Sequence, residues 1–313
     1  MSTMQLQPLP EAVAQLEELW LLGQPTLGHL LEFVDDSVAG SDILDRRALV
    51  AEWRAANEYC QQLERSEAGI ALDGRHRALD PGLADLAAEV QAHPRFTEAY
   101  DTLPTEFGMV ELDRLIVDQV HVTRNHVEAV AARIGPDPEP RTLFRHCFPL
   151  GEPEARVEIR EVGAHRYVFR CPSTDFRFHE AVLLKPGQLQ GYQSFGAIAG
   201  VVGLVVGFGC NFLSAVRVGR RHLLVNGYHR AVALRSLGLT HAPCIVQTAT
   251  CVDELALCTK SRVSERAEFY FESARPPLLK DFFDPKLRKL FPLRPRMRHI
   301  EVSFEVKDYL LSE

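Results

Sequence analysis

The stretch "HLLVNGYHRAVALRSLGLTHAPCIV", residues 222–246, decides the fold. Residues 222–225 are typical of a strand, and the Asn-Gly pair that follows predicts a tight turn. An alanine-rich helix is expected over 229–237, and Gly238 supplies the left-handed residue on which helices commonly end. Residues 242–247 predict the next strand. The sequence therefore predicts a strand–turn–helix–strand unit.

The turn of this unit, Asn226 to Arg230, reads NGYHR. It leaves the backbone N–H groups of Gly227, Tyr228 and His229 at the partially positive end of a helix, where anions bind. Gly227 lets a ligand approach the backbone, and His229 and Arg230 can add charge-assisted hydrogen bonds. The pattern predicts a phosphate site. The alternative is a plain tight turn, with a solvated Arg230 and with His229 bonded to a nearby carbonyl.

Length and composition describe a protein with a substantial core. The 313 residues, 46% of them hydrophobic, suffice for two ordinary domains or one large one. The seven cysteines are spread out and lack the paired spacing of a secreted disulfide framework, and the polar, acidic start carries no signal-peptide pattern. We therefore expect a cytoplasmic protein. The net charge of −7 argues against a dedicated nucleic-acid binder.

Residues 195–216 form an uncharged stretch that is long enough to span a bilayer. Its glycines weaken a helix, and no aromatic belt flanks it. Asn211 and Ser214 add polar groups to its last third. We expect a glycine-rich buried loop that leads into a core strand, and no membrane span.

The chain is expected to divide at a proline-rich connection over 136–150. Three prolines in "GPDPEPRTLF" disfavour both a helix and a central strand there. Before this connection, apolar side chains recur at helical spacing, Leu112, Leu115 and Ile116 among them. We expect a helical domain or subdomain over 1–135.

After the connection, the period of the sequence changes from that of helices to that of strands. Residues 155–171 alternate apolar and polar side chains on either side of Gly163, which predicts a hairpin. Residues 297–306 are a candidate for a final strand. The expected fold class is α+β, with a mixed-sheet domain over 151–260 and a basic wrapping segment over 261–313.

The segment 280–298 is strongly basic. Its seven lysines and arginines against two aspartates leave a local charge of about +5. Phe282, Phe283 and Phe291 are interleaved with these charges, as expected of residues that anchor a wrapping segment to a core. The segment either binds polyphosphate, nucleic acid or an acidic partner, or packs on the acidic N-terminal half of the same chain, which we expect.

The strand–turn–helix–strand unit resembles the core of the ParB/sulfiredoxin-like superfamily. The shared features are the Gly-x-His-Arg turn at 227–230, the short alanine-rich helix, Leu-Gly-Leu at 237–239 and "APCIV" at 242–246. The resemblance covers residues 183–246. It implies a domain that binds nucleotides or acts on phosphate, since ParB proteins bind CTP and DNA, sulfiredoxins use ATP to phosphorylate a cysteine sulfinate, and related kinases phosphorylate free serine.

The resemblance implies that the turn holds the phosphates of ATP or ADP, with Mg²⁺. Tyr228 stands where sulfiredoxins have their reactive cysteine, which argues against sulfinate reduction. In the serine kinases a carboxylate before the motif acts as general base; Glu180 and Asp175 are the candidates, although neither matches the family pattern. His229 is the other candidate catalytic residue. The leading hypothesis is a protein that binds a nucleotide or a phosphorylated small molecule, in its enzymatic form a small-molecule kinase.

Two other classes of function compete with this hypothesis. A non-enzymatic interaction or regulatory protein would keep the fold as a scaffold and bind a protein partner through the N-terminal helical region; the absence of an acid at the kinase position favours it. A nucleic-acid-binding protein would use the basic segment, but no clear helix-turn-helix follows the core. The intervals between Cys244, Cys251 and Cys258 do not suit zinc, so no metal site is expected.

Overall fold

The chain forms two compact units, and each draws on two separate segments. In the computed structural model the described residues are 16–74, 76–151, 155–173, 176–188 and 196–309. The first unit comprises Met1–Leu150 and Asn211–Pro295, and the second comprises Gly151–Cys210 and Arg296–Glu313. Helices and strands are mixed, which confirms the α+β class. The expected domain over 151–260 is divided between the two units, because residues 151–210 belong to the second unit and residues 211–260 belong to the first.

A six-stranded mixed sheet organises the first unit, in the order β2-β3-β12-β10-β11-β4. The hairpin β10–β11 is antiparallel, whereas β10 runs parallel to β12 and β11 runs parallel to β4. Strand β3 closes antiparallel on β12. The strands are β2 (Arg77–Ala78), β3 (Thr105–Glu111), β4 (Ile116–Val117), β10 (Ser214–Val218), β11 (Arg221–Asn226) and β12 (His241–Thr248).

The predicted strand–turn–helix–strand unit is confirmed. Strand β11 is followed by the helix α7 (Tyr228–Ser236), and β12 comes after it. Gly238 has φ +84°, so the helix ends on the left-handed glycine that the sequence predicts. The helix packs on α5 (Arg124–Ile134). Its alanines and leucine are buried, which fixes it against the core.

A second, three-stranded sheet of the first unit has the order β13-β1-β5. Its strands are β1 (Glu17–Leu21), β5 (His121–Thr123) and β13 (Arg288–Pro292), and both pairings are antiparallel. Because β13 belongs to the basic segment, its pairing with β1 confirms the predicted packing on the N-terminal half for residues 288–292, whereas Arg296 and Arg298 belong to the second unit. Lys280 binds Glu67 at 2.7 Å, and Phe291 is buried.

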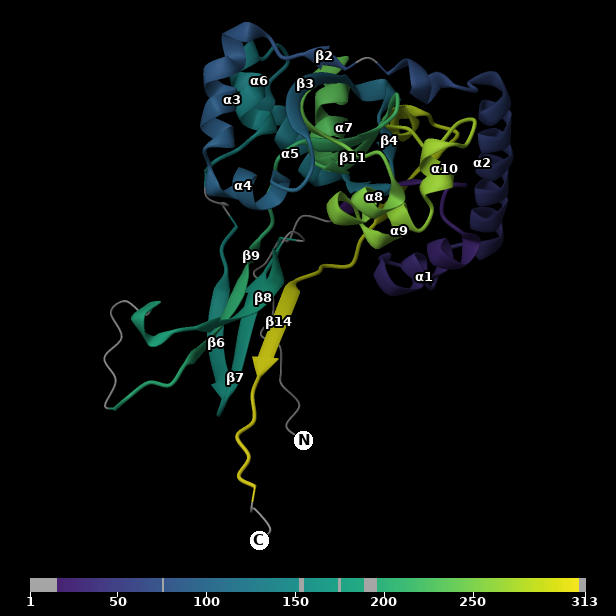
Figure 1. Cartoon of the computed structure of the whole chain (residues 1–313). Helices are drawn as coiled ribbons and strands as arrows, with labels where there is room; N and C mark the ends of the chain where they lie inside the picture. The colour runs from purple at the N-terminus through teal and green to yellow at the C-terminus, as the bar shows by residue number, and fades with distance from the viewer. Residues whose placement is uncertain (1–15, 75, 152–154, 174–175, 189–195, 310–313) are drawn as a thin grey trace. The chain divides into compact units, whose positions relative to one another are not determined.

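Helices cover the sheets of the first unit (Figure 1). Asp45 caps the longest of them by accepting from two backbone N–H groups. The helices besides α7 are α1 (Leu27–Ser37), α2 (Arg46–Ser66), α3 (Ala84–Gln91), α4 (Pro94–Tyr100), α5 (Arg124–Ile134), α6 (Pro140–Cys147), α8 (Val252–Cys258), α9 (Ser261–Ser264) and α10 (Ala267–Phe271), with 3₁₀ turns η1 (Ile70–Asp73), η2 (Pro81–Leu83), η3 (Leu112–Arg114) and η5 (Leu279–Phe283).

The sequence predicts a helical segment over residues 1–135, but the structure also places strands there. Strands β1, β3, β4 and β5 all lie within it. The expected helical face through Leu112, Leu115 and Ile116 is wrong, because these residues belong to η3, its cap and β4. These three side chains are buried within short elements, so their apolar spacing does not distinguish a strand from a helix.

The second unit consists of short antiparallel strands. Its three-stranded sheet has the order β14-β7-β6, and a separate pair joins β8 to β9. The predicted hairpin about Gly163 and the predicted final strand are both confirmed. The elements are β6 (Glu158–Gly163), β7 (Arg166–Cys171), β8 (Phe176–Leu184), η4 (Pro186–Gln188), β9 (Val201–Phe208) and β14 (Arg298–Ser303).

The glycine-rich stretch 195–216 differs in part from its prediction. Residues 201–208 form strand β9, in which Val202 is 67% exposed, so the expected buried loop is wrong. The stretch does lead into a core strand, since β10 begins at Ser214. Among the described residues, no helix is long and apolar enough to cross a bilayer.

Candidate functional site

The turn at 226–227 lies where two parallel strands end. Leu223 pairs with Ile116 and Leu224 pairs with Val117, so β11 and β4 have their carboxyl ends at the same edge of the sheet. Asp118 follows β4 directly, and its carboxylate therefore comes to the start of α7. Ligands of mixed α/β sheets commonly bind at such an edge. This placement makes the amino end of α7 the candidate site.

Gly227 is the residue before α7, and its conformation explains why it is glycine. Its φ is +89°, in the left-handed region, and its N–H donates to Oδ1 of Asn226 at 2.8 Å. A Cβ atom here would lie 2.6 Å from Cδ1 of Leu213 and 3.2 Å from its Cα. The close approach that the sequence predicts is therefore made by Leu213, within the protein.

The first turn of α7 keeps backbone donors available. No side chain caps the helix, and within the described part of the chain no acceptor is found for the N–H groups of Tyr228 and His229. The N–H of Ala231 already donates to the carbonyl of Gly227 at 2.8 Å. Two amides thus stand at the positive end of the helix dipole.

Tyr228 points its side chain into the protein, and it is 4% exposed. Its hydroxyl donates to Oδ1 of Asp118 and lies close to the carbonyl of Leu224. Burial, followed by the charge of Asp118, raises the pKa of this phenol well above its ordinary value. The phenol therefore stays protonated at neutral pH and positions Asp118.

Asp118 holds two cations beside the same turn. Its side chain is only 2% exposed, and its Oδ2 accepts from Nε of Arg262 at 2.7 Å and lies 3.7 Å from Nζ of Lys260. Lys260 also lies over the Tyr228 ring, 5.7 Å from its centroid. Both cations remain about half exposed. Asp118 therefore brings two cationic side chains to the hydroxyl of Tyr228, the first residue of α7.

Asp118 is not among the site residues predicted from the sequence. A signal was present, because "LIVD" at 115–118 is an apolar run that ends in an acid. That run reads as part of a helix, and a helix would not have brought the acid to the turn. Only the pairing of β4 with β11, more than 100 residues later in the chain, places it there.

His229 is not arranged as a proton acceptor. Its Nε2 already accepts from the N–H of Thr123 at 3.0 Å. Burial, aided by the nearby rings of His126 and His121, lowers its pKa to about 3. A neutral imidazole whose acceptor nitrogen is occupied orients the start of α5, so this geometry does not support the predicted catalytic role.

Arg230 differs from both of its predicted roles. It is 9% exposed, so it is not solvated. Its Nη1 donates to the carbonyls of Cys147 at 3.2 Å and Asn211 at 3.1 Å. Arg230 thereby ties the end of α6 to the segment that enters β10, and this geometry gives it a structural role instead of a direct bond to phosphate.

The general bases predicted from the sequence are Glu180 and Asp175. Glu180 is an exposed residue of β8 in the second unit, whereas Asn226 to Arg230 belong to the first unit. Asp175 lies outside the described residues. Their role as a base therefore stays a prediction. The carboxylate that the structure does bring to the turn is Asp118.

The described residues hold no group of three or more histidines, cysteines, aspartates or glutamates that suits a metal ion. Comparisons with family models, curated proteins and solved structures found no match. The resemblance to the ParB/sulfiredoxin-like superfamily thus stays a prediction based on the residues of the turn.

Proposed function

We propose that the protein binds an anionic ligand that carries a phosphate group at the amino end of α7. The observation that carries this proposal is that buried Asp118, which accepts from the hydroxyl of Tyr228, also contacts Lys260 and Arg262, while two amides in the first turn of α7 have no described acceptor. Phosphate oxygens would accept from the N–H groups of Tyr228 and His229. The two cations would add charge-assisted hydrogen bonds to the same group.

The physical basis is preorganisation. A helix amino end carries about half a positive charge, and each cation near it attracts an anion. Lysine and arginine side chains normally lose about 2 kcal/mol of rotamer entropy when they are fixed. Here Asp118 already restrains Arg262, and the Tyr228 ring restrains Lys260. Less ordering therefore remains to oppose binding.

The narrower proposal is that the ligand is a nucleotide such as ATP or ADP, with Mg²⁺. Mg²⁺ prefers carboxylate, phosphate and water oxygens, and Asp118 is the carboxylate at the turn. Both oxygens of Asp118 are engaged, one by Tyr228 and the other by Arg262. The ion would therefore depend on the phosphates of the nucleotide for its ligands. The geometry supports binding better than phosphate transfer.

A second candidate function is that of a non-enzymatic interaction protein. The observation that favours it is that Tyr228, His229 and Arg230 all direct their side chains to partners inside the protein. The motif would then serve to join β11, α5 and α6. In that case the chain would bind no phosphate at α7.

Calorimetric titration of the full chain with ATP, ADP, CTP and pyrophosphate tests the proposal. We expect the double variant Lys260→Ala/Arg262→Ala to bind at least about tenfold more weakly, because each charge-assisted hydrogen bond contributes about 1.5–3 kcal/mol. Arg141→Ala/Lys286→Ala is the matched control, since it removes two cations from elsewhere on the first unit. Equal affinities of the two double variants, or no binding of any anion by the wild type, would reject the site and favour the interaction protein.

A further inference from the structure

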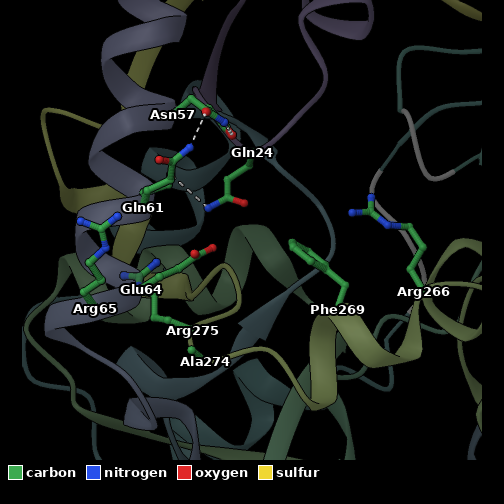
Figure 2. Close-up of a pocket in the computed structure, with 11 residues that line it drawn as sticks. Gln24, Asn57, Gln61, Glu64, Arg65, Arg266, Phe269, Ala274 and Arg275 are labelled. Carbon is green, nitrogen blue, oxygen red and sulfur yellow. Dashed lines mark hydrogen bonds between the residues drawn. The ribbon is translucent and has the colours of Figure 1, made fainter.

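A cavity of about 660 Å³ opens on the first unit, between α2 and the region of α10 (Figure 2). This volume falls in the range of small-molecule sites, roughly 300–1,000 Å³. One wall is formed by α2, and the opposite wall is formed by Phe269 of α10. Nothing in the candidate site at α7 contributes to this lining.

Three carboxamides line the α2 side of the cavity. Asn57 and Gln61 are one helical turn apart on α2, and Gln24 follows β1. Gly23 allows this approach, because a Cβ atom there would lie 2.7 Å from the backbone of Ala56 and Asn57. The loop after β1 therefore rests directly on α2 and presents Gln24 beside Gln61.

These carboxamides retain capacity to bind a ligand. Nδ2 of Asn57 donates to the carbonyl of Gly23 at 3.1 Å, which fixes that side chain. The amide nitrogen of Gln24 donates to Sγ of Cys60 at 3.4 Å, and that of Gln61 makes only a long contact, at 3.5 Å to Oδ1 of Asn57. Within the described residues, no protein donor reaches Oε1 of either glutamine. Each glutamine thus offers a carbonyl acceptor and an N–H donor on one planar group.

The base of the cavity is electrically balanced. The guanidinium of Arg275 is taken up by Glu67 and by Asp281, and Lys280 binds Glu67 as well. Two cations and two carboxylates therefore cancel. Burial raises the pKa of the Cys60 thiol to about 11, so this group is also uncharged at neutral pH. A ligand that reaches Arg275 therefore meets a balanced cluster, whereas Glu64, Arg65 and Arg266 add charged groups elsewhere in the lining.

The opposite wall is aromatic. Phe269 faces Gln24 and Gln61 across the cavity in Figure 2. The guanidinium of Arg266 lies 4.5 Å from the centroid of the Phe269 ring, which holds that ring in place. Flat heterocycles stack on such a ring, and carboxamides bind the paired donors and acceptors at their edge.

We infer that this cavity binds a nucleobase or an uncharged nucleoside. The ring of the base stacks on Phe269, and its donor–acceptor edge pairs with Gln24 and Gln61. The Arg275 guanidinium at the base is already taken up by two carboxylates, so it is not available to a free phosphate or a carboxylate. This inference is independent of the phosphate site proposed at α7.

Titration of the full chain with adenosine, guanosine, cytidine and uridine, followed by calorimetry or ligand-observed NMR, tests the inference. At least one nucleoside is expected to bind, and D-ribose is not. Gln61→Ala and Gln24→Ala should each weaken that binding about fivefold or more, the equivalent of one hydrogen bond of about 1 kcal/mol. Gln62→Ala is the matched control, because Gln62 is an exposed neighbour on α2 outside the cavity.

Binding that falls in Gln61→Ala but not in Gln62→Ala supports the site. Absence of binding by all four nucleosides, equal binding of ribose, or equal effects of Gln61→Ala and Gln62→Ala would overturn it. Adenosine lacks phosphate, so the Lys260→Ala/Arg262→Ala variant should retain nucleoside binding. The two proposals can therefore fail separately.

Discussion

Replacing Gly227 by alanine should cost more stability than the same change at Gly238, although both glycines adopt nearly the same backbone conformation. Their φ angles are +89° and +84°. Alanine in this region costs about 1–2 kcal/mol, part of which is offset because alanine restricts the unfolded chain. A Cβ atom at Gly238 meets nothing within 4 Å. Gly238→Ala should therefore lower the free energy of unfolding by about 1 kcal/mol.

The same atom at Gly227 would lie 2.6 Å from Cδ1 of Leu213, a residue that is fully buried. Leu213 cannot turn away without displacing its neighbours, and overpacking of this kind costs about 1–3 kcal/mol. Gly227→Ala should accordingly lose about 3 kcal/mol in total. At about 2–4 °C per kcal/mol, its melting temperature should fall about 4–8 °C below that of Gly238→Ala.

Thermal and urea unfolding, followed by circular dichroism, measure this difference. A further check is Gly227→Ala combined with Leu213→Ala, which should be less destabilised than the sum of the two single variants, by about 1–2 kcal/mol. If Gly227 serves only the approach of a ligand, the two glycine variants should unfold alike. Equal losses, with additive effects at Leu213, would refute the packing argument.

Three further predictions concern buried charges. Arg230→Ala should lower the free energy of unfolding by about 2–4 kcal/mol, since two buried carbonyls lose their donor. Anion binding by the folded Arg230→Ala variant should change less than in Lys260→Ala/Arg262→Ala, and calorimetry on the two variants checks this. Burial lowers the pKa of His222 to about 4 from about 6.5, so the unfolded chain takes up the proton first as pH falls. About 3 kcal/mol of stability should therefore be lost between pH 6.5 and pH 4. In a plot of urea midpoint against pH, His222→Gln should flatten this part of the curve. Asp281→Ala should cost about 3–5 kcal/mol in urea unfolding because Arg275 stays buried, and a loss below 1 kcal/mol would contradict the role of this ion pair.

The elements that could be predicted from the sequence are those whose signals are local. Strand β11, helix α7, Gly238 and strand β12 follow one another within 28 residues, and each carries its own turn or period signal. The hairpin about Gly163 is confirmed for the same reason. The short strands near the N-terminus could not be predicted, because their partners β12, β11 and β13 lie more than 100 residues away.

In the candidate site, too, the features with local signals could be predicted and those that depend on distant residues could not. The turn at Asn226–Gly227 and the start of α7 were correctly predicted from their residues. The directions of the Tyr228, His229 and Arg230 side chains depend on Asp118, Thr123 and Cys147, which come from other parts of the fold. A sequence motif shows which groups a turn can offer, whereas packing determines whether they face a ligand or the core.

The order of the segments has a consequence for synthesis of the chain on the ribosome. The chain passes between the two units three times, and each unit is completed by a strand near the C-terminus, β13 in the first and β14 in the second. Strand β3 is synthesised about 130 residues before its partner β12. At about 5–20 residues per second, its unpaired edge is open for several seconds in the nascent protein. A chaperone that shields strand edges during translation would therefore act on β3, and on the edge of β1 that pairs with β13 about 270 residues later, and the two units would close only after β13 and β14 have left the exit tunnel.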